Sequence, residues 1–206
     1  ARDAVRSITE RLEPLGFVGH VLQEHAGDRD DPSQDSPPFL VTRKRVLSEL
    51  EALRQGLGPD DTIVIYSHSH GTKGRDGRLG GLPLDDPGTG RWRPLYLDWR
   101  EYADRLLRLP ARTVVVLTMA CHSGGLADFL NSDESAKNLW QSRKDQGRNF
   151  LVMTSQNSHA LSNPRRIEGA IINPFTHALI KAFGGEADGY RRGMAETHPD
   201  GRITLG

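Results

Sequence analysis

Two short clusters of histidine and cysteine carry the side chains best suited to chemistry. Ser-His-Ser-His-Gly occupies residues 67–71, and Ala-Cys-His-Ser-Gly-Gly occupies residues 120–125. A thiol is a weak nucleophile at neutral pH unless a neighbouring base or dipole favours its thiolate form. A histidine can act as that base and can later protonate a leaving group. Cys121 and His70 therefore have the chemistry of a nucleophile and its general base, while His68 lies nearer the preceding strand and is expected to pack or orient.

Each cluster follows an apolar segment that predicts a buried strand. Residues 62–67 and 113–120 are β-branched and apolar almost throughout, as is typical of central parallel strands covered on both faces. A helix is predicted to begin near Gly124, and the free N–H groups at its N-terminus favour a negatively charged sulfur. Because sites in parallel sheets form at the carboxyl ends of the strands, we expect the two clusters to meet there.

The remaining elements predict an α/β fold. Helices are predicted over residues 5–15, 42–57, 98–107, 124–130 and 174–183. Asp98 and Glu101 resemble a capping box at the start of the third helix, and Asn173 is the expected cap of the last one. Further strands are predicted over residues 17–22 and 150–155, and irregular segments over 27–38, 68–97 (with a hairpin turn at 74–77) and 131–149. The alternation of strands and helices predicts one domain over residues 1–206, with a mostly parallel central sheet and helices on both faces.

Length, charge and cysteine content exclude several classes of protein. The 206 residues suit a single globular domain. Basic and acidic residues are equal in number, 27 each, so the chain lacks the basic excess of a nucleic-acid-binding protein. The longest apolar run, 114–121, is far shorter than the about 20 residues that span a membrane. With a single cysteine no intrachain disulfide can form, and the expected location is the cytoplasm.

The two motifs and their spacing resemble the caspase-like cysteine peptidases, a group that includes caspases, metacaspases, legumains and bacterial relatives. These enzymes share a strand followed by His-Gly and a strand followed by Cys, with the histidine about 50 residues before the cysteine. Here 51 positions separate His70 from Cys121. Cys-His-Ser-Gly-Gly is close to the metacaspase form of the nucleophile motif. Three further segments are similar to the family: residues 60–62, 150–152 and 173–176.

The resemblance covers most of residues 1–183 and implies a fold and a mechanism. The implied fold is the caspase-haemoglobinase-like three-layer sandwich. The implied activity is that of a cysteine endopeptidase acting on proteins or peptides, with His70 as general base and Cys121 as nucleophile. The N–H groups of Gly71 and Cys121 would form the oxyanion hole. This chemistry needs neither a metal nor an organic cofactor.

The resemblance also indicates where the substrate side chain before the cleaved bond (P1) would bind. In the family, the segment after the strand that follows the cysteine lines the primary pocket, which here corresponds to residues 155–166. The substrate-binding candidates are Asp128, Ser155, Gln156, Asn157 and Arg165. Arg165 and Arg166 could attract an acidic P1 residue, but bacterial and plant relatives mostly prefer Arg or Lys. We therefore expect a basic P1 preference, although Met119 replaces the acidic residue that metacaspases carry two positions before the cysteine.

Residues 131–149 lie where caspases carry their intersubunit linker. The segment is polar and is predicted to be an exposed loop, a place where proteolytic nicking concentrates. We expect activation through cleavage after one of its basic residues, by the enzyme itself or by an upstream protease, or through a regulatory partner. The candidates are Lys137, Arg143, Lys144 and Arg148. Such regulation would suit a cell-death or anti-phage defence cascade.

Three other interpretations of the same residues remain open. A metal site could use the imidazoles and the thiol of the two clusters, namely His68, His70, Cys121 and His122. A serine hydrolase could use Ser123 as nucleophile, with His177 or His198 as base. A catalytically inert caspase-like module could serve only as a binding scaffold.

Overall fold

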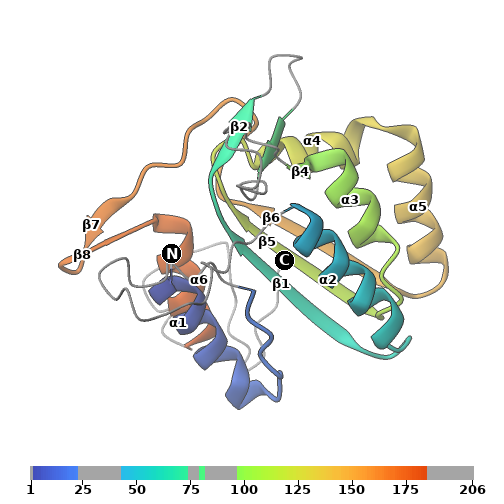
Figure 1. Cartoon of the computed structure of the whole chain (residues 1–206), viewed down its shortest axis with the longest axis horizontal. Helices are drawn as coiled ribbons and strands as arrows, with labels where there is room; N and C mark the ends of the chain where they lie inside the picture. Colours follow the sequence, from blue (N-terminus) through green and yellow to red (C-terminus); the bar gives the residue numbers. More distant parts are fainter. Residues whose placement is uncertain (1, 23–42, 74–78, 82–96, 185–206) are drawn as a thin grey trace, which may run out of the picture. The chain divides into compact units, whose positions relative to one another are not determined.

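The computed structural model describes residues 2–22, 43–73, 79–81 and 97–184 (Figure 1). These residues belong to two compact units. The larger unit spans residues 22–162, and the smaller one combines the N-terminal 21 residues with the chain from residue 163 onward. The loop expected at 27–38, the hairpin turn expected at 74–77 and His198 all lie outside the described residues.

A parallel three-stranded sheet forms the centre of the larger unit. Its strands are β1 (Thr62–His68), β5 (Thr113–Met119) and β6 (Asn149–Thr154), in the order β1-β5-β6. Figure 1 shows β5 between its two neighbours. The three core strands predicted from the apolar runs are thus confirmed, and the fold is α/β with a parallel central sheet.

Four helices of the larger unit pack against the sheet. They are α2 (Arg43–Gly56), α3 (Trp99–Leu107), α4 (Gly124–Ser132) and α5 (Glu134–Asp145). Side chains alternate between the two faces of a strand, so every second residue of each strand faces these helices. The shared core contains Leu50, Trp99, Leu106, Val114, Val116, Leu126 and Phe150, with Ile63, Ile65 and Val152 packed against it.

Helix α5 corrects the prediction of an exposed loop over residues 131–149. Asp133 caps the helix, because its carboxylate accepts a hydrogen bond from the N–H of Ala136 at 3.0 Å. The residues that face the core are Ala136, Leu139, Trp140 and Arg143, which recur at helical spacing. The prediction missed this periodicity because one of the four is an arginine.

Arg143 is only 4% exposed and links α5 to the end of α3. Its guanidinium donates hydrogen bonds to the main-chain carbonyl oxygens of Leu107, Leu109 and Ala111. Burial, together with the nearby Arg148, lowers the pKa of Arg143. These carbonyl groups end a helix and open a connection, so they would otherwise lack donors in the protein interior.

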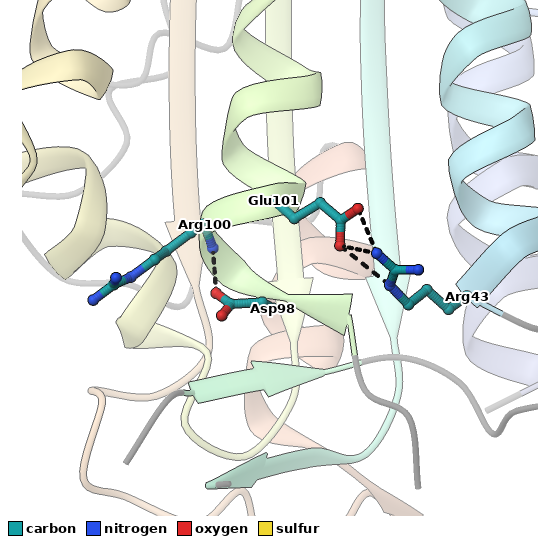
Figure 2. Close-up of polar contacts among 4 residues, drawn as sticks. All are labelled: Arg43, Asp98, Arg100 and Glu101. Carbon is teal, nitrogen blue, oxygen red and sulfur yellow. Dashed lines mark hydrogen bonds and ion pairs between the residues drawn. The ribbon is translucent and has the colours of Figure 1, made fainter. Parts of the chain in front are cut away.

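The start of α3 matches one part of the predicted capping box and departs from the other. Asp98 accepts a hydrogen bond from the N–H of Arg100 at 2.8 Å, as an N-cap does. Glu101, the expected second partner of the box, forms an ion pair with Arg43 instead, with a shortest N···O distance of 2.6 Å (Figure 2). The pair joins the N-terminal turns of α2 and α3.

A small antiparallel sheet follows β1 where an irregular segment was predicted. Its strands are β2 (Gly71–Lys73), β3 (Leu79–Gly81) and β4 (Leu97–Asp98), in the order β2-β3-β4. Each strand has only two or three residues, which is too short for a periodic pattern to show in the sequence.

The smaller unit is built on two helices. Helix α1 (Arg2–Leu12) packs against α6 (Pro174–Phe183), and the hairpin of β7 (Arg165–Ile167) and β8 (Ala170–Ile172) precedes α6. The predicted cap of α6 is confirmed, since Asn173 accepts from the N–H of Phe175 at 2.9 Å. Among the residues that the structure describes, no helix is long and apolar enough to cross a bilayer.

The strand predicted over residues 17–22 is wrong. A short 3-10 helix, η1 (Glu13–Leu15), follows α1, and Gly16 ends it with a left-handed φ of 87°. The next residues form neither helix nor strand, and the side chain of Val18 is 94% exposed. Apolar residues alone do not make a strand when no neighbour pairs with its main chain.

Candidate active site

The register between β1 and β5 brings the two motifs together. Each residue of β1 pairs with the residue 51 positions later, up to His68 opposite Met119. The pairing continues past the strands, because the N–H of Ser69 donates to the carbonyl oxygen of Met119 at 3.0 Å. Continued two residues beyond its last pair, this register would set His70 opposite Cys121. The 51 positions between the two residues in the sequence therefore equal the offset between paired residues of β1 and β5.

Directly after His70 the main chain passes against the peptide of Cys121. A Cβ atom added to Gly71 would overlap the carbonyl oxygen of Cys121 and would lie 2.6 Å from its carbonyl carbon. No side chain fits in that space, which is a physical reason for glycine after the histidine. Gly71 also opens β2, where it pairs with Gly81.

Cys121 lies in the turn between β5 and α4 and is partly buried. The main-chain N–H of Ser162 donates a hydrogen bond to its Sγ atom at 3.2 Å, and the carbonyl oxygen of Ser162 lies 4.0 Å from the same sulfur. An N–H group directed at sulfur stabilises negative charge on it. The sequence did not point to Ser162, because a main-chain contact leaves no mark in the residue type.

The two histidines of the first motif lie in different surroundings. His70 is exposed just beyond the end of β1. His68 is partly buried, and its Nδ1 atom lies 3.2 Å from the hydroxyl oxygen of Tyr66. Burial, helped by the neighbouring His70, lowers the pKa of His68 to about 4. His68 is therefore neutral near pH 7 and acts there as a packed hydrogen-bonding group.

His122 has a left-handed backbone, with a φ of 56°, and three contacts fasten it. Its N–H donates to the carbonyl oxygen of Ala160 at 2.9 Å, and its Nδ1 atom lies 2.9 Å from the carbonyl oxygen of Ser158. The indole N–H of Trp99 donates to the carbonyl oxygen of His122 at 3.1 Å. The imidazole is thus directed toward the segment that follows β6.

The hydroxyl groups near the turn hold its main chain. Ser123 is 0% exposed, and its Oγ atom accepts a hydrogen bond from the N–H of Gln156 at 3.2 Å. The N–H of Ala120 donates to Oγ of Ser155 at 3.3 Å. Two of the residues expected to bind substrate, Ser155 and Gln156, therefore make contacts that brace the turn after β5.

The other substrate-binding candidates are exposed. Asn157 accepts the N–H of His159 at 2.9 Å through its side-chain oxygen, and Asp128 lies on α4. Arg165 lies in β7 of the smaller unit. In that unit His177, considered as the base of a serine hydrolase, has its Nε2 atom 4.0 Å from Glu168.

No metal centre coincides with these residues in the described part of the chain. No group of three or more His, Cys, Asp or Glu side chains is arranged there to hold a metal ion. A cavity of about 500 Å³ is lined by residues of α2, α3 and α5 and of the turns that lead into β5 and β6. It lies toward the amino ends of these strands, at the end of the sheet away from Cys121.

Comparisons with known proteins assign no family to the chain. No model of a protein family matches it, and neither does any curated protein. The functional interpretation therefore depends on the geometry of this site and on the resemblance of its motifs.

Proposed function

We propose that the chain is a caspase-like cysteine endopeptidase in which Cys121 is the nucleophile and His70 the general base. The observation that supports this proposal is the register of β1 and β5, which pairs His68 with Met119 and so brings the two motifs to the carboxyl ends of adjacent parallel strands. Binding and catalytic residues of parallel α/β sheets lie at that edge. The close approach of Gly71 to Cys121 keeps the two strand ends in contact.

The reaction begins with transfer of the thiol proton of Cys121 to His70. The sulfur then attacks the carbonyl carbon of the peptide bond, and the N–H groups of Gly71 and Cys121 stabilise the oxyanion. As the C–N bond breaks, protonated His70 gives its proton to the leaving amine, and a thioester remains. Water, deprotonated by His70, hydrolyses the thioester, releases the acid product and restores the thiol.

The resemblance alone supports the finer parts of the proposal. They are the three-layer caspase arrangement, a preference for Arg or Lys at P1, activation by cleavage or by a partner, and a cytoplasmic role in a cell-death or anti-phage cascade. The serine alternative gains no support from the geometry, because the hydroxyl of Ser123 is buried and bonded to the main chain of Gln156.

Hydrolysis of fluorogenic peptides before and after thiol alkylation tests the proposal. Iodoacetamide should label one site per chain, since Cys121 is the only cysteine, and should abolish hydrolysis. Cys121→Ala and His70→Ala should each remove activity while the far-ultraviolet circular dichroism stays unchanged. If the Cys121→Ala variant kept most of its activity and the Ser123→Ala variant lost it, the serine mechanism would be established instead.

A further inference from the structure

We propose that His122 is a positioning residue, which fastens the segment of residues 155–162 across the turn after β5 so that Ser162 donates its N–H to the sulfur of Cys121. The catalytic value of this arrangement rests on the proposed peptidase function. The hydrogen bond from Ser162 to the sulfur does not depend on that function, because it acts on the sulfur with any substrate.

The segment follows the turn through contacts that run along its whole length. At its start, Ser155 and Gln156 bond to the main chain of Ala120 and to the hydroxyl of Ser123. In its middle, the carbonyl oxygens of residues 158 and 160 meet the imidazole and the N–H of His122. At its end, the N–H of residue 162 reaches Cys121 at 3.2 Å. Along residues 155–162, the contact with the His122 imidazole is the last one that a side chain of the turn makes before Ser162 reaches the sulfur.

The imidazole contact defines the tautomer of His122. A carbonyl oxygen can only accept a hydrogen bond, so the Nδ1 atom that lies 2.9 Å from the oxygen of Ser158 must carry a hydrogen. The bond forms in both the neutral and the protonated imidazole, provided that the neutral form keeps its hydrogen on Nδ1. The fastening should therefore persist across the pH range in which a thiol enzyme works.

Close packing at Gly124 shows that the segment lies directly on the turn. A Cβ atom on Gly124 would be 2.5 Å from the nitrogen of Ser158 and 2.6 Å from the carbonyl carbon of Asn157. The segment therefore approaches the start of α4 as closely as two main chains allow. At this distance the side chain of His122 spans the short gap to the Ser158 carbonyl.

The backbone conformation of His122 indicates that its side chain has a role. A φ of 56° is uncommon for a residue with a Cβ atom, and glycine or asparagine adopts it more readily. A histidine in this conformation is strained, and its contacts with Ser158, Ala160 and Trp99 hold it there. Because glycine would relieve the strain but supply no donor, substitution can separate the two effects.

The reactivity of Cys121 measures this positioning directly. The thiolate is the form that reacts with alkylating agents, and an N–H donor on sulfur favours it. Since the chain has one cysteine, the rate of alkylation by iodoacetamide at pH 7 reports on Cys121 alone. The readout requires no knowledge of the peptide substrate.

Three variants separate the donor from the strain. His122→Asn keeps a donor at an equivalent position and tolerates the left-handed backbone, whereas His122→Gly tolerates the backbone and lacks the donor. His159→Ala is the matched control, because His159 is an exposed histidine of the same segment. We expect alkylation to slow about tenfold in His122→Gly, the effect of one hydrogen bond to a charged group. His122→Asn should restore most of the rate, and His159→Ala should leave it unchanged.

The outcomes distinguish this inference from the proposed function. Alkylation of folded His122→Gly at the wild-type rate, or of His122→Asn as slowly as the glycine variant, would overturn the positioning role. If thermal unfolding shows that His122→Gly does not fold, the asparagine variant decides: a rate near wild type supports the role and a tenfold loss refutes it. If no variant hydrolyses any peptide but the alkylation rates follow the expected order, only the peptidase proposal fails.

Discussion

At Gly71 the main chain passes so close to the carbonyl of Cys121 that a methyl group has no room. Gly71→Ala should therefore push the two strand ends apart, lower the free energy of unfolding by about 1–3 kcal/mol and abolish peptide hydrolysis. Urea denaturation and a peptidase assay measure the two effects. The matched control is Gly56→Ala in α2, where an added Cβ meets nothing within 4 Å. That variant should keep its activity, and its free energy of unfolding should rise by up to about 1 kcal/mol.

His68 should make the stability of the protein depend on pH. Its pKa is lowered from 6.5 to about 4 in the folded chain, so the folded state resists protonation that the unfolded state accepts. The contribution of His68 to the free energy of unfolding is fully present above pH 6.5 and is lost as the pH falls from 6.5 toward 4. Between pH 7 and pH 5 the unfolding free energy should fall by about 1 kcal/mol more in the wild type than in His68→Gln, allowing for the solvent around the ring.

Urea denaturation at the two pH values tests this difference. His159→Gln, an exposed histidine in the same unit, serves as the control and should behave like the wild type. An identical pH dependence in wild type and His68→Gln would show that the burial of His68 does not govern its protonation.

At the scale of elements, α5 depends on Arg143 for its attachment to α3. Arg143→Met removes the donors of three buried carbonyl groups and should lower the free energy of unfolding by about 2–4 kcal/mol. Lys137→Met on the same helix loses only an exposed ion pair with Glu134 and should cost less than about 0.5 kcal/mol. Chemical denaturation of both variants measures the difference, and equal costs would contradict an anchoring role for Arg143.

The helix also changes which bond an activating protease could reach between residues 131 and 149. Three of the four basic candidates lie within α5, and only Arg148 lies beyond it, next to Gly147 with its left-handed φ of 68°. A protease needs an extended chain, so a cut should fall after Arg148 and not after Lys137. Mass spectrometry of the active enzyme locates the cut. Arg148→Gln should prevent it, whereas full activity of an uncut chain would contradict activation at this place.

At the scale of the whole molecule, the two units divide the candidate residues between them. His70, Cys121 and every contact described for the sulfur belong to residues 22–162, whereas Arg165 belongs to the smaller unit. We expect faster hydrolysis of peptides with Arg or Lys at P1 than with Asp or Glu, and no loss of this preference in Arg165→Gln. A peptide panel that varies only P1 measures it. A preference for acidic P1 residues that disappears in Arg165→Gln would assign the specificity to Arg165.

The residue types by themselves predicted the parallel sheet and the strand ends that carry the candidate residues. The apolar runs of β1, β5 and β6 predict buried strands because β-branched side chains favour extended chain, and the separation of His70 from Cys121 matches the register. The caps of α3 and α6 also followed from single polar residues at helix starts.

Only the tertiary structure decided the burial of Arg143, the pairing of β2 with β3, and the contacts of Ser162 and His122 around the sulfur. Arg143 is buried because the carbonyl groups that it satisfies come from the end of α3 and the connection after it, more than 30 residues away in the sequence. Ser162 reaches Cys121, and Ser158 receives the imidazole of His122, through main-chain atoms that every residue type possesses. Such contacts depend on where the chain passes and not on which side chains it carries, so they leave no pattern in the sequence.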